Sequence, residues 1–261
     1  MGSDAHPNMG ALGLLGFDAA ASGWHVGLAT YVVIVGAAVA GWLPFEIMDR
    51  FGFCQGYRIG ASNVVETAPE KARLRALAER MVIRNIALLL PLSLTGGPVL
   101  AALLSFDSSN SWLGSSLLWQ LPLFFLVDDM CFYAYHRALH TNPAWYRKYH
   151  KPHHEFKQVF GIVSHATHPV EMLLQSVGAM LGPLLLGVPR QTFWLWLVLR
   201  QWQGIEDHCG YEFPFSLSCL CPSVFGGAPF HDLHHSKNCG NFASVFPFID
   251  RAFGTVIKVK R

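Results

Sequence analysis

Long apolar runs constrain the fold of this 261-residue chain more than any other feature. Three runs, residues 24–48, 82–105 and 112–135, are each long enough to cross a bilayer as a helix. A further apolar stretch, residues 169–205, is divided by a Gly-Val-Pro-Arg turn and could form two spans or a re-entrant hairpin. Only 14% of the residues are charged, too few to cover a soluble surface of this size. The sequence therefore predicts an all-α, integral-membrane helical bundle of about four transmembrane helices.

The distribution of basic residues orients this bundle. They gather in residues 49–84 and again in 137–157, and the positive-inside rule places both segments on the cytosolic side. The N-terminal tail and the turn at 106–111 then lie on the opposite side. Within the second apolar run, residues 96–98 (Gly-Gly-Pro) predict a kink or a break.

Three regions are expected: an exposed tail (1–23), N-terminal transmembrane helices with a cytosolic connector (24–110), and a catalytic region (111–261). The tail has no Lys or Arg and so lacks the basic start of a signal peptide. The net charge of +2 and the lack of a basic, aromatic-rich run argue against nucleic-acid binding. Six cysteines form no disulfide framework, which favours free thiols in a reducing compartment.

Eleven of the thirteen histidines lie between residues 136 and 235. Eight of them form three clusters: His136 and His140; His150, His153 and His154; and His231, His234 and His235. The first pair, at i and i+4, shares a helix face and can bind one metal ion. In each of the other clusters the i and i+3 histidines share a face and the adjacent one points elsewhere, so each cluster can serve two metals. Eight imidazoles exceed one tetrahedral site, so the count predicts at least two metal ions, while imidazole alone suits zinc, copper, iron and nickel alike.

Residues near the clusters are predicted to support them. Asp129 and Tyr133 precede His136 and His140 with a 4-3-4 spacing and share their helix face. A charge inside an apolar run is expensive and usually functional, so we expect the Asp129 carboxylate to accept from the N–H of a ligand imidazole. Pairing with a nearby Arg is the alternative. Asp128 points off this face and is expected to be a structural partner.

Two further histidines are candidate ligands. His208 follows the last apolar run, and His168 opens the run that begins at residue 169. His165 is a weaker candidate, and the alternative for it is a polar residue near the site.

The sequence resembles the fatty acid hydroxylase/sterol desaturase superfamily over residues 121–255, and within it the C-4 methylsterol oxidases most closely. The shared motifs are Asp129 with Tyr133, the three histidine clusters, His-Pro-Val-Glu at 168–171, His-Cys-Gly-Tyr-Glu-Phe-Pro at 208–214, Gly-Asn-Phe-Ala-Ser at 240–244 and Asp-Arg-Ala-Phe-Gly-Thr at 250–255. Two positions depart from the branch: Gln203 stands where a Glu is usual, and the Ser-His at 164–165 is closer to the C-5 sterol desaturase pattern.

The resemblance implies two iron ions, O2 as co-substrate, and electrons from NAD(P)H through cytochrome b5 and its reductase. It also implies residence in the endoplasmic reticulum and oxidation of an unactivated C–H of a sterol, the C-4 methyl group in sterol biosynthesis. Basic residues between the clusters could meet an acidic electron donor or anionic lipid headgroups, or be ordinary positive-inside charge: Arg147, Lys148, Lys151 and Lys157.

Two other functions remain open at the level of sequence. The same metal site could serve a sterol C-5 desaturase or a fatty acid or alkane hydroxylase, because hydrogen-atom abstraction is common to all of them. Clustered histidines could instead hold zinc in a membrane hydrolase or in a non-catalytic sterol binder.

Overall fold

The computed structural model describes residues 22–59, 67–105 and 114–257, and these are almost entirely helical. Within those ranges no strand occurs, only isolated bridges at Arg58–Tyr211 and Ser105–Pro189. Five long helices build the bundle: α2 (Gly23–Phe51), α3 (Ala68–Leu103), α4 (Leu117–Thr141), α6 (Pro169–Leu186) and α7 (Arg190–His208). The prediction of an all-α bundle is confirmed. The expected tail and the turn at 106–111 lie outside the described residues, apart from the last two tail positions.

Four of these helices, α2, α3, α4 and α6, are long and apolar enough to cross a membrane. Helix α7 follows α6 after a tight turn at Gly187, which has a positive φ of 57°. It is as long as α6, yet it bears Arg200, Glu206 and Asp207 in its last three turns, and it packs against α2 in the bundle. The prediction of about four spans is therefore confirmed, and the second half of the 169–205 stretch is a helix inside the bundle.

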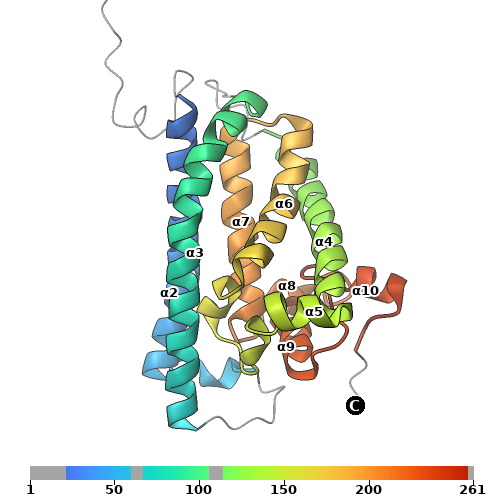
Figure 1. Cartoon of the computed structure of the whole chain (residues 1–261). Helices are drawn as coiled ribbons and strands as arrows, with labels where there is room; N and C mark the ends of the chain where they lie inside the picture. The colour runs from blue at the N-terminus through green and yellow to red at the C-terminus, as the bar shows by residue number, and fades with distance from the viewer. Residues whose placement is uncertain (1–21, 60–66, 106–113, 258–261) are drawn as a thin grey trace, which may run out of the picture.

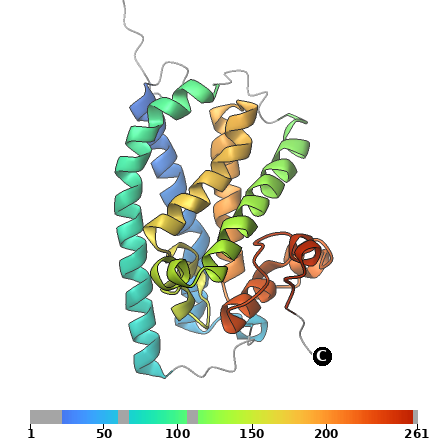
Figure 2. The ribbon, with the colours of Figure 1, turned by 45° about the vertical axis from the view of Figure 1, so that its right-hand side comes forward.

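Helices α2 and α3 lie side by side along one edge of the bundle (Figure 1). Glycines allow this contact: a Cβ at Gly27 would lie 2.2 Å from the Ser93 carbonyl oxygen, and one at Gly97 would lie 2.1 Å from that of Gly23. Backbones approach this closely only where side chains are absent. Of the two outcomes predicted for 96–98, the break does not occur, because α3 continues to Leu103, whereas the change of direction near the C-terminal end of the helix agrees with the kink (Figure 2).

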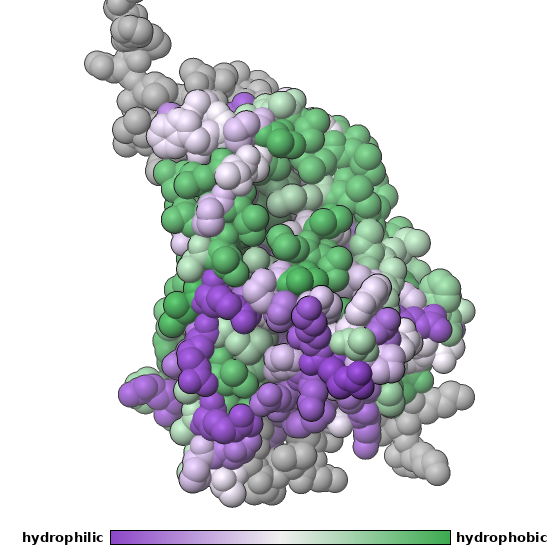
Figure 3. Space-filling view, viewed as in Figure 1, coloured by the Kyte–Doolittle hydropathy of each residue, from purple (hydrophilic) through white to green (hydrophobic). Residues whose placement is uncertain are grey.

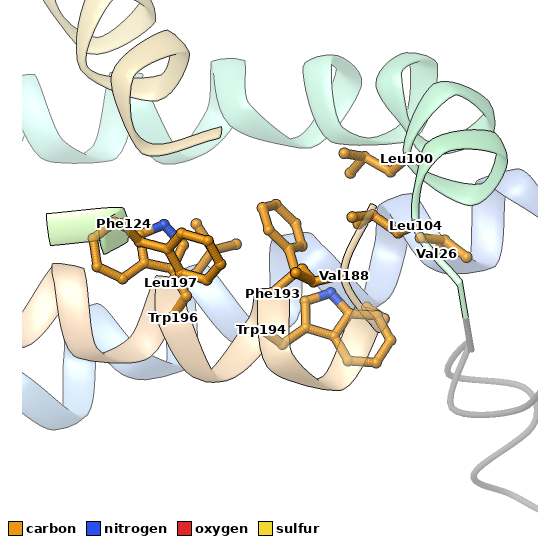
Figure 4. Close-up of a cluster of buried hydrophobic side chains, with 10 residues drawn as sticks. Val26, Leu100, Leu104, Phe124, Val188, Phe193, Trp194, Trp196 and Leu197 are labelled. Carbon is orange, nitrogen blue, oxygen red and sulfur yellow. The ribbon is translucent and has the colours of Figure 1, made fainter. Parts of the chain in front are cut away.

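One apolar core cluster of the bundle lies among α2, α3, α4 and α7. Phe193, Trp194 and Trp196 of α7 face Leu100 of α3 and Phe124 of α4 there (Figure 4). The indole N–H of Trp194 donates to Thr30 Oγ1 at 3.0 Å, and that of Trp196 donates to the Ala179 carbonyl at 2.7 Å. Both polar groups are thereby satisfied where water is excluded.

The surface divides the molecule into two parts. One long part is covered by apolar side chains, and hydrophilic side chains gather at the other end (Figure 3). The short helices lie at this polar end: α5 (Pro143–Trp145), η3 (Tyr146–His150), η4 (His153–Glu155), η5 (Gly161–His165), α8 (Leu217–Leu220), α9 (Gly227–Lys237) and α10 (Pro247–Phe253). The end of α4 and the start of α6 therefore place the histidine-bearing segments next to the apolar part.

Candidate metal centre

Nine imidazoles converge at the polar end, and they form two groups in which all candidate ligand atoms lie within 4.8 Å of one another. The first group holds five: His136, His140, His150, His154 and His234. The second holds four: His153, His208, His231 and His235. All are buried except His140, which is half-buried. The groups adjoin, since the rings of His154 and His235 stack at 4.7 Å.

The sequence clusters do not map one to one onto these groups. His150 shares a group with His154, and His231 shares a group with His235, so the i and i+4 partners meet. The expected i and i+3 pairing of His150 with His153, and of His231 with His234, is wrong. The reason for the first pair is local: His150 ends the π-helical turn η3 and His153 begins the 3-10 helix η4, so no continuous α-helix relates them. Each of the two later clusters serves both groups, as its adjacent histidines predict.

Backbone carbonyls hold the outward-facing ring nitrogens. Nδ1 of His136 lies 2.7 Å from the Phe242 oxygen, Nδ1 of His234 lies 2.7 Å from that of Gly240, and Nδ1 of His208 lies 2.8 Å from that of Gly204. Nδ1 of His153 and of His235 have carbonyl partners at 3.3 and 3.1 Å. A carbonyl oxygen only accepts, so each Nδ1 carries the proton and each Nε2 of a neutral ring is a bare lone pair.

These lone pairs point at one another. Nε2 of His136 lies 3.1 Å from Nε2 of His150, and Nε2 of His208 lies 3.3 Å from Nε2 of His153. Two acceptors at this distance cannot form a hydrogen bond without a proton between them, and burial disfavours an imidazolium. A metal ion removes the conflict, because nitrogens that each bind one ion at about 2.1 Å lie roughly 3 Å apart. The donor set therefore fits metal ions in both groups.

The buried rings are held in the form that binds metal. Burial lowers the pKa of His153 to about 4 and that of His150 to about 3. Burial also lowers the pKa of His231, His234 and His235 well below the usual value. At neutral pH these rings are uncharged, and neutral imidazole is the ligand of first-row transition metals.

Glu171 is a supporting residue that the sequence reasoning did not assign. It is buried in the first turn of α6, and one of its carboxylate oxygens lies 3.0 Å from Nδ1 of His150. A carboxylate behind a ligand imidazole fixes the tautomer of the ring and raises its basicity. The signal was present in the sequence, because Glu171 is the only acid in a long apolar run.

Asp129 acts on a loop rather than on an imidazole. Its two carboxylate oxygens accept from the backbone N–H groups of Ser244 and Phe246, each at 2.7 Å. That loop also contains Phe242, whose carbonyl accepts from His136. The expected contact of Asp129 with a ligand ring is wrong, and so is the alternative of an Arg partner, because it is Asp128 that forms the ion pair with Arg200.

Tyr133 likewise faces the C-terminal segment. Its hydroxyl lies 3.2 Å from Thr255 Oγ1, and its ring stacks on Phe253 at 5.0 Å. Asp250 supports the same loop, accepting from the N–H groups of Phe242 and Ala243 at 2.8 Å each. The face of α4 that bears Asp129 and Tyr133 thus positions the loop, and neither side chain reaches the histidine groups through a hydrogen bond in the described residues.

Among the weaker candidates, the structure brings His208 into the second group and leaves His168 outside both. His168 precedes α6 and caps it, with Nδ1 accepting from the Val170 N–H at 3.1 Å. Its ring packs against that of Tyr149, with 5.0 Å between the centroids. His165 also lies outside the groups, and its Nε2 is 3.0 Å from Gln201 Oε1.

A cavity of about 170 Å³ opens onto both histidine groups. The ligand rings at its end are those of His136, His150, His153, His208 and His231. Apolar side chains of α2, α3 and α6 form much of its wall, among them Ile34, Val82 and Met172. A lipid could therefore reach the metal centre from between the membrane helices.

A helical membrane protein with two adjoining imidazole groups beneath an apolar cavity defines a class of membrane metalloproteins, and comparisons with known proteins agree. The fatty acid hydroxylase family model matches residues 121–255. The chain is 38% identical to methylsterol monooxygenase 2-2 of Arabidopsis thaliana, over 82% of this chain and 79% of the relative. It is 35% identical to methylsterol monooxygenase 2-1 of the same plant, over 82% and 81% of the two chains. A very-long-chain aldehyde decarbonylase of Oryza sativa subsp. indica is 34% identical over 82% and 79%.

The chain belongs to the fatty acid hydroxylase family. It is a multi-pass membrane protein and an oxygen-dependent oxidoreductase. No solved structure shows significant similarity to it.

Proposed function

We propose that this protein is a membrane di-iron monooxygenase that oxidises the C-4 methyl group of a sterol in sterol biosynthesis. The observation that carries the proposal is the apolar cavity that ends on both imidazole groups. A lipid in this cavity presents a C–H bond directly to the metal centre. The relatives named methylsterol monooxygenase support the sterol as substrate.

The residues of this chain bind the metal ions, orient the ligand rings and exclude water from the substrate. We propose that the five and four imidazoles of the two groups each hold one iron ion. Two irons bound there supply the activation of O2 that is needed to oxidise an unactivated C–H. The carbonyls of Phe242 and Gly240 keep the rings of His136 and His234 in their ligand tautomers, and the carboxylate of Glu171 lies beside Nδ1 of His150. The apolar wall excludes water and positions the substrate carbon.

Electrons are proposed to come from NAD(P)H through cytochrome b5 and its reductase. Arg147 and Lys148 are exposed on the segment that leads from α4 to the second histidine cluster, and Lys151 is exposed within that cluster. Lys157 is half-buried, and its ammonium donates to the His235 carbonyl at 3.2 Å. The three exposed cations suit an acidic donor protein near the metals, and anionic lipid headgroups are the competing partner.

The proposed cellular location is the endoplasmic reticulum membrane, with the metal centre on the cytosolic side. The basic residues around the connector, among them Arg50 at the end of α2 and Arg73 at the start of α3, lie at the same end as the histidines, where Arg73 pairs with Glu155, as the positive-inside rule requires. Residues 111–261 are proposed as the catalytic region because they supply all nine imidazoles. Residues 24–110 contribute to substrate binding, since α2 and α3 line the cavity.

The test is product analysis with the full-length, iron-loaded protein in lipid nanodiscs, supplied with NADPH, cytochrome b5 reductase and cytochrome b5. With 4,4-dimethylsterol we expect an oxidised 4-methyl product that depends on O2, and none from His234→Ala. A new ring double bond indicates a desaturase, and an alkane formed from a long-chain aldehyde indicates a decarbonylase. Turnover without O2 indicates a zinc hydrolase, and sterol binding without turnover indicates a binder. Any of these results in place of the 4-methyl product overturns the proposal.

A further inference from the structure

One polar patch in the cavity wall is not explained by the metal centre. His165 and Gln201 both line the cavity, and neither belongs to the two imidazole groups. They come from different segments, η5 and α7, and they meet through His165 Nε2 and Gln201 Oε1 at 3.0 Å. Much of the surrounding wall is apolar, so a polar pair is costly there unless it has a ligand.

The contacts of His165 determine which way the Gln201 amide faces. An amide oxygen only accepts, so His165 donates from Nε2 to Gln201 Oε1. Nδ1 of the neutral ring then carries no proton and lies 2.7 Å from Ser164 Oγ, which is also 2.9 Å from the Gly161 carbonyl oxygen, so the single hydroxyl proton serves one of these two acceptors. The amide oxygen of Gln201 is thus occupied, and its amide nitrogen keeps two N–H donors.

These donors have no protein acceptor in the described part of the chain. Other polar side chains that line the cavity are engaged: Asn85 donates to the carbonyls of His165 and Thr167, and Ser176 donates to that of Met172. A half-buried amide with two free donors in a largely apolar wall fits an oxygen of the bound molecule.

Gln201 stands in line with the metal centre. Gly204 and His208 follow it at three and seven residues on α7, so the three share one helix face, and all three line the cavity. Gln201 and His208 are about 10 Å apart along the axis. Between them a Cβ at Gly204 would lie 3.1 Å from Arg200 Nη1, so the absence of a side chain there leaves room for the Arg200 guanidinium beside the cavity.

We infer that Gln201, held by His165, donates a hydrogen bond to the hydroxyl oxygen of the substrate and thereby selects a lipid alcohol. This inference rests on the proposed function. A 4-methylsterol carries its hydroxyl on carbon 3, next to carbon 4. An oxygen bound at about 3 Å from the Gln201 nitrogen leaves the neighbouring methyl carbon on the His208 side of the gap. Gln201 is the specificity-determining group, and His165 is a positioning residue.

The test compares 4,4-dimethylsterol with its 3-deoxy analogue, using the iron-loaded protein in nanodiscs. Binding is measured as displacement of a radiolabelled sterol, and turnover is measured in parallel. We expect the unaltered protein to prefer the alcohol by about tenfold or more in both measurements, as sites that pair with a substrate hydroxyl do. In Gln201→Leu, binding and turnover of the alcohol should fall to within about threefold of those of the deoxy analogue. Binding and turnover of the deoxy analogue itself should change little.

His165→Phe removes the donor that orients the amide, and it should reduce the same preference. A general packing defect would weaken the binding of both sterols equally and leave the ratio of their affinities unchanged. Gln175→Leu, a second glutamine of the wall, should leave the ratio unchanged. Loss of the preference in Gln175→Leu, or its retention in Gln201→Leu, overturns the inference. If neither sterol is turned over, the proposed function fails, while the binding ratio still decides the role of Gln201.

Discussion

At the residue scale, metal binding depends on which of the two ring nitrogens carries the proton in each neutral imidazole. Carbonyl oxygens behind His136, His208 and His234 force the proton onto Nδ1 and leave Nε2 free to bind. The same residue type serves elsewhere as a helix cap at His168 and as a donor to an amide at His165. A backbone carbonyl at Nδ1 is therefore found behind five of the nine grouped histidines and behind neither His165 nor His168.

His168 provides a test of this distinction. We expect His234→Ala to lower the bound iron from two ions to one or none, because it removes a ligand of the first group. His168→Ala should keep both ions and lose only a helix cap, about 0.5–2 kcal/mol of stability. Iron is measured in purified protein by mass spectrometry. Loss of iron in His168→Ala would return this residue to the ligand set.

Glu171 should tune the centre without binding the metal. Glu171→Gln keeps an acceptor for His150 but removes the negative charge, whereas Glu171→Leu removes both. We expect iron affinity to fall about 10- to 100-fold in Glu171→Leu and by less in Glu171→Gln. Competition with a chelator of known affinity measures the effect. Equal affinities in all three proteins would show that the carboxylate does not act through the ring.

At the element scale, one face of α4 connects the membrane part to two neighbouring segments of the metal centre. His136 and His140 point into the first group, while Asp129 and Tyr133 hold the loop that follows α9. Sequence periodicity placed all four on one side of the helix, and the structure shows that two neighbouring segments share that side. The loop carries the acceptors of His136 and His234, so fixing it fixes the ligands.

Replacing Asp129 tests this coupling. Asn at 129 offers one acceptor where the carboxylate offers two, so one of the N–H groups of Ser244 and Phe246 is left unpaired in a buried site. We expect a loss of about 1–3 kcal/mol in the free energy of unfolding. Faster amide hydrogen exchange in residues 240–246 should accompany it. Exchange that speeds up uniformly over the chain, with none concentrated in this loop, would contradict the assignment.

The contact of α2 with α3 offers a second test at this scale, with a matched pair on one helix. Gly27→Ala places a methyl group against the Ser93 carbonyl and should destabilise the protein by about 1–3 kcal/mol. Gly36→Ala meets no atom within 4 Å and should be neutral or stabilising by up to about 1 kcal/mol. Thermal unfolding in detergent compares the two variants. Equal shifts would mean that the glycine contact does not hold the helices together.

At the scale of the whole molecule, the apolar and polar parts of the surface define how the protein sits in a bilayer (Figure 3). The metal centre lies where they meet, so a lipid can enter from one side and a soluble donor can approach from the other. Exposed cysteines mark the polar end: Cys54, Cys219, Cys221 and Cys239.

This arrangement predicts the result of labelling in sealed microsomes. In a background without other cysteines, Cys219 should react with an impermeant maleimide added from the cytosolic side. A Trp24→Cys variant, at the exposed N-terminal end of α2, should react only after permeabilisation. The reverse pattern would place the metal centre in the lumen.

The class of protein could be predicted from the sequence: apolar runs of spanning length predicted the helical membrane bundle, and histidine spacing predicted a site for two metals. These are local properties, because a run or a helical repeat can be read along one segment. Only the tertiary structure decided which histidines share a group, since His154 meets His234 across 80 residues. It also decided that His168 caps a helix and that Asp129 holds a loop. The acceptors that orient the rings are mostly backbone carbonyls, which every residue carries, so no sequence pattern marks them in advance.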